Sequence, residues 1–165
     1  MIMNKKPTEN EIRERHDLMF RLWNSYWLEY IAHVFNRRID AAINAVILAS
    51  GAAVFSDSNF GWLLGGVVAV LSGCNIAWKF GQRAQSAKEQ AHRYNVLISE
   101  SESANLSNDV VLKKLLEIEV HDSPVLECMD KPARNKACMS MGLKHRDHLS
   151  FSQKLVALLT VGIPR

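Results

Sequence analysis

The sequence predicts an all-α membrane protein in which a two-helix transmembrane hairpin is joined to N- and C-terminal cytosolic helices that form a bundle. Three observations support this fold class. Residues 41–78 contain one charged side chain, Asp57. All 20 Lys and Arg residues of the 165-residue chain lie outside that stretch. Elsewhere the apolar residues recur at helical spacing, and there is no alternating pattern typical of strands.

The chain divides into three expected segments: residues 1–38 as an N-terminal cytosolic aromatic helix, residues 39–79 as the transmembrane hairpin, and residues 80–165 as a C-terminal cytosolic helical region. The first helix starts at a capping box, in which Thr8 and Glu11 bond to each other's backbone amides. Its wide aromatic face favours packing against the other cytosolic helices or a position at the lipid headgroups over a ligand cage of aromatic rings. This face contains Trp23, Tyr26, Trp27 and Tyr30.

The hairpin has arms at residues 41–56 and 58–78, on either side of a polar turn that contains Asp57. At about 1.5 Å per residue the arms are about 24 and 31 Å long, against a hydrocarbon layer of about 30 Å. The first arm is therefore slightly short and the second sufficient. The positive-inside rule predicts a multi-pass protein of the cytoplasmic (inner) membrane, with both termini in the cytoplasm and Asp57 outside. The start of the chain lacks the pattern of a cleaved secretory signal, so the hairpin itself is expected to direct insertion.

The alternative is a soluble protein in which two hydrophobic helices form the buried centre of a globular bundle. The pattern disfavours it, because buried helices of a small domain usually keep a polar stripe.

After the hairpin we expect a helix from Gly81 to about Ser103 that continues the second arm into the cytoplasm. A shorter helix should follow, capped by Ser107 or Asn108 and running to Ile118. Ser123-Pro124 predicts a further helix start, because proline favours the first helical position. Asp130-Lys131-Pro132 predicts a restart that ends at Gly142. Residues 149–163 are apolar but too short to span, so they should dock against the bundle or the inner leaflet.

Small residues recur at every fourth position on both arms and form two ridges of the small-xxx-small type. One interpretation is that the ridges close the hairpin on itself. The other is that a ridge contacts neighbouring copies and makes a homo-oligomer. The ridges consist of Ala41, Ala45, Ala49 and Ala53 on the first arm and Gly61, Gly65, Ala69, Gly73 and Ala77 on the second.

Folding the chain at the polar turn brings Asp40 level with Lys79 and Asn44 level with Asn75. Asp40 and Lys79 are then expected to form a charge pair at the inner mouth, with little net energy but a role in register. An unpaired amide is costly one turn deeper, so Asn44 and Asn75 should bond to each other, to a neighbouring subunit or to water. They are interpreted as an inter-helix clasp or, in an oligomer, as a polar ring lining a pore.

The sequence shows no pattern of an enzyme, because it has no Gly-rich phosphate loop, no nucleophile elbow and no His-Glu-x-x-His. His145 and His148 could share a helix face as metal ligands, but no third ligand is evident, so we expect no metal site and no cofactor. Cys74, Cys128 and Cys138 have no Cys-x-x-Cys spacing and are interpreted as reduced. The modest net charge of +3 favours contact with anionic headgroups of the lipid bilayer over nucleic-acid binding.

The arrangement resembles the SLATT family, the two-helix membrane effector domains of nucleotide-sensing bacterial defence systems. The similar features, in chain order, are an aromatic helix ending at Tyr30 to Ile39, a tight hairpin, a basic helix from Lys79 through Tyr94-Asn95, and Ser123-Pro124 followed by Ala133-Arg134-Asn135. The resemblance implies an effector that forms pores in the membrane or disturbs it once a partner senses infection. The sequence shows no fused sensor domain, so a separate sensor protein or a cyclic-nucleotide signal is implied.

These features lead to one principal hypothesis, an oligomeric antiphage effector that permeabilises the membrane. Two alternatives stay open. The first is a membrane-anchored adaptor or scaffold without pore activity, and the second is a phage holin or exclusion protein.

Overall fold

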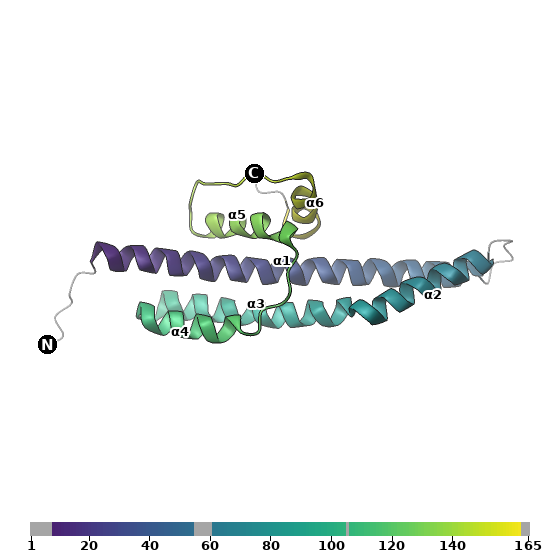
Figure 1. The fold of residues 1–165 in the computed structure, drawn as a ribbon, viewed down its shortest axis with the longest axis horizontal. Coiled ribbons are helices and arrows are strands. Elements are labelled where there is room, and N and C mark those ends of the chain that lie inside the picture. The colour runs from purple at the N-terminus through teal and green to yellow at the C-terminus, as the bar shows by residue number, and fades with distance from the viewer. Residues whose placement is uncertain (1–7, 55–60, 105, 163–165) are drawn as a thin grey trace.

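The computed structural model describes residues 8–54, 61–104 and 106–162, and within these ranges the chain is helical, with no β-strand. Figure 1 shows one very long helix with the remaining helices packed along it. In chain order the elements are α1 (Glu9–Val54), α2 (Gly61–Trp78), α3 (Phe80–Ser103), α4 (Asn108–Glu119), the 3₁₀ turn η1 (Glu127–Met129), α5 (Asp130–Ser140) and α6 (Phe151–Thr160). The polar turn with Asp57 falls outside the described residues.

Helix α1 runs without a break through the expected boundary at residue 38. Its 46 residues span about 69 Å at the usual helical rise. It begins as the sequence predicts, because the Thr8 amide donates to the Glu11 carboxylate at 2.6 Å. No glycine or proline occurs between Glu9 and Ser50, so nothing in the sequence interrupts the helix at the charged residues Arg37, Arg38 and Asp40. The aromatic helix and the first arm are therefore one element.

A single residue separates the second arm of the hairpin from the helix that follows it. Lys79, between α2 and α3, has φ 50° and ψ 47°, which is the left-handed helical region. Its amide still donates to the Asn75 carbonyl at 2.9 Å, and its carbonyl accepts from the Arg83 amide at 3.0 Å. These bonds continue across Lys79, so the chain bends there without losing its helical hydrogen bonding. The helix expected after the second arm therefore follows at once as α3.

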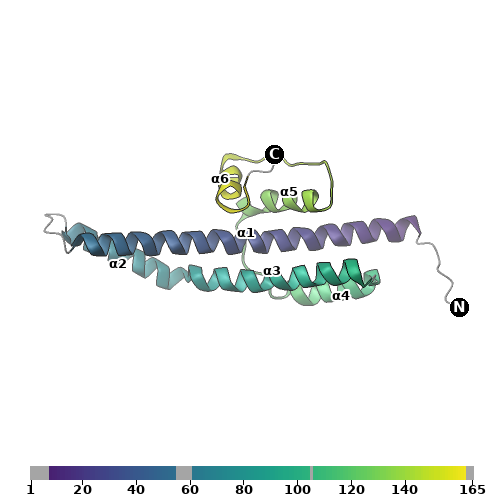
Figure 2. The same ribbon diagram turned by 180° about the vertical axis from the view of Figure 1, so that it is seen from behind.

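The helices outside the hairpin form a body with α1 at its centre. Figures 1 and 2 show α3 and α4 on one side of α1, and α5 and α6 on the other. Leu22 on α1 packs with Tyr94, Leu97 and Ile98 of α3 and with Leu115 of α4. On the other side of the body, Ile31 and Ala32 pack with residues from α3, η1, α5 and α6. These residues are Ala87, Met129, Ala133 and Val156.

The aromatic face of α1 packs against the body. Trp23 and Tyr26 contact the cluster around Leu22, and the Trp27 indole donates to the Ser140 hydroxyl of α5 at 2.9 Å. The structure thus has these rings against other helices of the described chain, which is the first of the placements that the sequence favoured over a ligand cage.

The prediction of a helix start at Ser123-Pro124 is wrong. Residues 122–126 have no helical structure, and helical turns resume only at Glu127. The physical reason is a tertiary contact, because the Ser123 amide donates to Glu29 of α1 at 2.7 Å and holds the segment extended. The predicted helix from Asp130 to Gly142 is confirmed. Gly142 takes φ 70°, and the Leu143 amide closes the end on the Cys138 carbonyl at 2.8 Å.

The contact at Ser123 belongs to a buried polar group beneath the turn between α4 and η1. Glu29 is 2% exposed, and its second carboxylate oxygen has no hydrogen-bond partner among the described residues. Beside it, Asp122 accepts from the Tyr94 hydroxyl at 2.5 Å and from the Gln90 amide at 2.9 Å. Burial raises the pKa of Glu29, its bonds to Ser123 lower it in part, and the charge of Asp122 raises it again. Burial, followed by the bond to Asp122, likewise raises the pKa of Tyr94.

The raised pKa of Glu29 makes stability depend on pH. Below its ordinary pKa the carboxyl is protonated in both the folded and unfolded states. As pH rises past that value the unfolded state loses the proton first, so folded stability falls until the native carboxyl also ionises. We expect Glu29→Gln to raise the unfolding midpoint in detergent at pH 8 and to leave it almost unchanged at pH 4. Glu102→Gln, at an exposed position, should change neither. A variant less stable than wild type at pH 8 would contradict this account.

Two adjacent leucines of α4 test the core. Leu115 is fully buried and Leu116 is 48% exposed. Leu115→Ala should lower the free energy of unfolding by about 2–5 kcal/mol through lost burial and a cavity. Leu116→Ala should lower it by about 0.5 kcal/mol or less. Urea unfolding followed by circular dichroism measures both, and equal losses would mean that α4 is not docked as described.

Candidate functional site: the apolar hairpin and its neck

Helix α2 is apolar and uncovered. None of its residues is buried, Trp62 is 80% exposed, and Ile76 is 74% exposed. Among the described residues, one helical stretch is long and apolar enough to cross a membrane, and it begins with α2 at Gly61. The soluble alternative, in which both arms form the buried centre of a bundle, does not fit a helix with no buried residue. So large an exposed apolar surface is typical of a site that contacts lipid or a partner.

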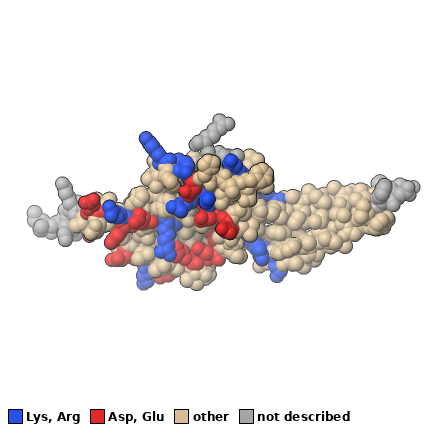
Figure 3. All heavy atoms as spheres, turned by 45° about the horizontal axis from the view of Figure 1, so that its top comes forward, with Lys and Arg blue, Asp and Glu red and all other residues tan. Residues whose placement is uncertain are grey.

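Charge and apolar surface are separated along the molecule. In Figure 3 the end formed by α2 and the second half of α1 shows no Lys, Arg, Asp or Glu, whereas both signs of charge cover the body. The boundary lies at Asp40 on α1 and Lys79 beside α3. We call this level the neck.

Branched side chains form the contact between the two arms. The less exposed residues include larger side chains at helical spacing, Ile43 and Ile47 on α1 and Leu64, Val68 and Leu71 on α2. They also include the smaller or polar residues Ser50, Gly51, Ala53, Gly61, Ser72, Cys74 and Asn75. Because α2 lies along α1, these positions mark the faces that the arms turn toward each other.

The small-residue ridges lie mainly on the outside of the hairpin. Ala41, Ala45 and Ala49 are exposed, and so are Gly65, Ala69, Gly73 and Ala77; Ala53 and Gly61, near the turn, are half-buried. A Cβ atom added at Gly61, Gly65 or Gly73 would meet nothing within 4 Å. Along most of the described hairpin the ridges therefore face outward, and larger side chains lie between the arms, so the two interpretations of the ridges stay predictions.

The structure brings the two asparagines together. The Asn75 side-chain amide donates to the Asn44 side-chain oxygen at 3.1 Å. The Asn44 amide nitrogen and the Asn75 oxygen have no hydrogen-bond partner among the described residues. Asn44 is also exposed, so the pair can accept a further partner from outside the hairpin.

Asp40 and Lys79 form no ion pair within 4.0 Å in the described part of the chain, in contrast to the expected charge pair. The Asp40 carboxylate lies instead against Gly81, where an added Cβ would stand 3.4 Å from its oxygen. The bend at Lys79 changes the register, so the residue facing Asp40 is two positions further along the chain. The missing side chain of Gly81 leaves room for that carboxylate between α1 and α3.

A cavity of about 340 Å³ lies at the neck, between α1, the junction of α2 with α3, and the turn that carries Ser123. Trp78 and Phe80 contribute an aromatic wall, with ring centroids 6.1 Å apart. Arg83, His121 and Asp122 add polar groups to its lining. An amphipathic lining of this kind fits a ligand with an apolar part and a polar part.

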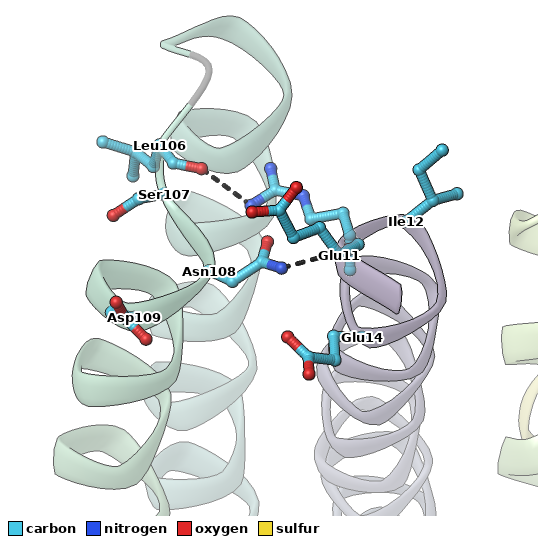
Figure 4. A pocket seen from close by; sticks show the side chains of 8 residues that line it. Glu11, Ile12, Glu14, Leu106, Ser107, Asn108 and Asp109 are labelled. Atoms are coloured by element: carbon cyan, nitrogen blue, oxygen red, sulfur yellow. Dashed lines mark hydrogen bonds between the residues drawn. The ribbon is translucent and has the colours of Figure 1, made fainter. Parts of the chain in front are cut away.

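A second cleft, of about 510 Å³, lies at the opposite end of the molecule. Figure 4 shows Asn108 reaching from α4 to the first turn of α1, where it donates to the Glu11 carbonyl at 3.2 Å. Arg15 donates to the carbonyls of Leu106 and Ser101 at 2.9 and 2.6 Å. These bonds hold the ends of three helices together, which gives the cleft a structural role.

The polar residues around Asp147 stabilise the loop between α5 and α6. Asp147 pairs with Arg134 at 3.4 Å and with His145 at 3.3 Å, and its backbone exchanges two bonds with the Asn135 side chain. The described residues contain no cluster of three His, Cys, Asp or Glu side chains that could hold a metal ion. The three cysteines are free.

Comparison with protein-family models, with curated proteins and with solved structures finds no match for this chain. The functional interpretation therefore depends on its own residues and their geometry.

The sequence analysis missed two features of the neck and the adjoining body. The left-handed Lys79 carries no signal, because glycine would be the usual residue there. The buried Glu29 had one possible signal, an acidic side chain in the middle of a wide aromatic face. Its partner Ser123 is 94 residues away, and no local pattern connects them.

The left-handed Lys79 is strained, since a side chain in this region costs about 1–2 kcal/mol. We expect Lys79→Gly to be about 1 kcal/mol more stable than Lys79→Ala, which keeps the strain but also lacks the charge. Thermal unfolding of the two variants in detergent measures the difference. Equal midpoints would show that the residue does not adopt this conformation.

Proposed function

We propose that the chain is an integral protein of the cytoplasmic membrane, with α2 and the second half of α1 crossing the bilayer and both termini in the cytosol. The observation that carries this proposal is the uncovered apolar surface of α2. Contact with lipid makes such a surface favourable, since exposing apolar surface to water costs about 25 cal/mol per Å². The positions of all 20 Lys and Arg residues outside the hairpin support the orientation.

Within the membrane, the hairpin assembles with further copies through its outward ridges. In lipid, helices associate mainly by close backbone approach, and exposed ridges of alanine and glycine permit it. The free amide nitrogen of Asn44 and the free oxygen of Asn75 support the same conclusion, because an unsatisfied polar group at that depth is unfavourable. A neighbouring copy, or water in a lumen, would supply the missing bonds.

The assembly acts as an effector that permeabilises the membrane, in agreement with the resemblance to the SLATT family. The trigger is a separate infection-sensing partner or a small anionic signal such as a cyclic nucleotide. For such a ligand the neck cavity offers the Arg83 guanidinium for the charge, His121 as a further polar group, and Trp78 and Phe80 for a ring. The Asp122 carboxylate in the same lining already accepts from Tyr94 and Gln90. A signal bound there would lie directly against the junction of α2 with α3.

One observation favours the adaptor as second candidate. The Asn44–Asn75 bond lies within a single hairpin, so part of the polar pair is satisfied without an oligomer. A membrane anchor for a cytosolic binding surface would need no more than this clasp. Replacing the hairpin with an unrelated two-helix anchor separates the candidates, because an adaptor should keep its activity and a pore-forming effector should lose it.

Two adjacent glycines provide a matched test of the effector. Gly65 lies on the ridge and Gly66 beside it, both are exposed, and an added Cβ at either meets nothing within 4 Å. Gly65→Leu should block close approach between copies, whereas Gly66→Leu adds the same apolar side chain off the ridge. On induced expression, we expect a membrane-potential dye to report depolarisation with wild type and with Gly66→Leu. Gly65→Leu should reduce it at least several-fold.

The amounts of wild type and both variants in the membrane are matched by immunoblot. The mass of each protein's particle is measured after solubilisation in detergent. Absence of depolarisation with the wild type, alone and with its trigger, would overturn pore activity. A monomer in detergent together with identical behaviour of both variants would favour the adaptor.

A further inference from the structure

Helix α6 presents large apolar side chains on the face that turns away from the protein. Val156 and Ala157 are buried against the body. Phe151, Leu155, Leu158 and Leu159 lie on the opposite face, and Phe151 is 84% exposed and Leu158 60% exposed. The spacing i, i+4, i+7, i+8 places these four on one side of a ten-residue helix. This face has no partner within the described chain.

The helix runs across α1. In Figures 1 and 2 α1 lies in the plane of the view, while α6 is seen nearly end-on, beside the end of α5 that is nearer the hairpin. Its Val156 packs in the cluster with Ile31 and Ala32 of α1, and Phe35 packs against the same cluster. These α1 residues precede Asp40 by five to nine positions, which is about 8–14 Å along the helix. A bilayer crossed by α1 would therefore have α6 parallel to its surface, just inside the neck.

This level corresponds to the lipid headgroups. The neck at Asp40 and Lys79 marks the edge of the hydrocarbon layer. A helix with its side chains has a radius of about 5–6 Å, so the side of α6 nearer the hairpin reaches to within about 3–8 Å of that edge. The headgroup layer adds about 5–7 Å beyond that boundary. The basic side chains Arg37, Arg38, Lys79 and Arg83 surround the same level, and Lys154 flanks the apolar face of α6.

We infer that the exposed face of α6 binds the inner leaflet, with Phe151, Leu155, Leu158 and Leu159 at the boundary between headgroups and acyl chains and Lys154 against anionic phospholipid headgroups. This surface rests on the proposed membrane topology and deepens it. An amphipathic helix parallel to the bilayer, with a basic residue at its edge, has the chemistry of an interfacial anchor. Because α6 packs on α1, such an anchor fixes the depth at which α1 enters the bilayer.

Single spin labels test this inference in the full chain. The background carries alanine at Cys74, Cys128 and Cys138, and circular dichroism confirms its helical content. Labels are placed at Leu158→Cys and Phe151→Cys on the apolar face, at Ser103→Cys, an exposed position at the end of α3 away from the neck, and at Val70→Cys in α2. Accessibility to oxygen and to a water-soluble nickel complex is measured in phosphatidylcholine vesicles with and without phosphatidylglycerol.

We expect the label at Val70 to lie deep in the bilayer. The labels at Leu158 and Phe151 should lie at a shallow depth, at least five-fold less accessible to nickel than the label at Ser103. Phosphatidylglycerol should increase this protection, and Lys154→Glu should cancel the increase.

The outcomes separate the two proposals. Water accessibility at Val70 would overturn the membrane topology itself. A deep Val70 with Leu158 and Phe151 as accessible to nickel as Ser103 would overturn only the inference about α6. Spin–spin broadening at Leu158 that disappears on dilution with unlabelled protein would show a second copy on this face and would also overturn it.

Discussion

Every other helix of the chain packs on α1, and the absence of any break in α1 is the constraint on which the arrangement depends. Its second half forms one arm of the hairpin, and its first half contributes Leu22, Ile31 and Ala32 to the two cores of the body. A helix without glycine or proline from Glu9 to Ser50 bends only gently over that length. The body and the hairpin are thus parts of one rod, so a change in how α3, α5 or α6 packs on the first half of α1 must change the tilt or rotation of its second half.

The returning chain has the opposite property. It is divided at Lys79, where a strained residue separates apolar α2 from charged α3 while the helical hydrogen bonds continue. The bend falls at the level where Asp40 packs on Gly81, and the neck cavity lies against it. One arm is therefore continuous and the other is jointed. Under the proposed membrane topology, this asymmetry would give a signal bound at the neck a route to the hairpin, because it would alter the angle of α2 at the joint while α1 keeps the body in place.

The sequence was sufficient for what depends on local patterns and insufficient for what depends on packing. Hydrophobic runs, caps and the glycine stop predicted α4 and α5 closely, and folding the chain at its turn placed Asn44 beside Asn75. Periodicity also located the small-residue ridges, but it gives only their spacing and not the face that the partner helix occupies. The branched residues Ile43, Ile47, Leu64 and Val68 compete for that face, and burying their larger surface turns the ridges outward. Ser123 failed for another reason, since a distant carboxylate, Glu29, outweighed a local helix signal.

The separation of charged from apolar side chains along the molecule bears on whether the exposed apolar surface of the hairpin is a functional feature. The body buries Tyr94 and gives its hydroxyl a partner, and it holds Glu29 in a specific contact, so the chain supports a well-packed core where water is the solvent. Beyond Asp40 and Lys79 the rules reverse: large apolar residues point outward, and the few polar groups, Asn44, Asn75 and Ser50, are positioned near or between the arms. In a protein surrounded only by water, nothing would favour the same reversal of the burial pattern at the neck on both α1 and the returning chain. Two solvents that meet at the neck explain the inversion, and they explain equally why the apolar face of α6 is left open at that level.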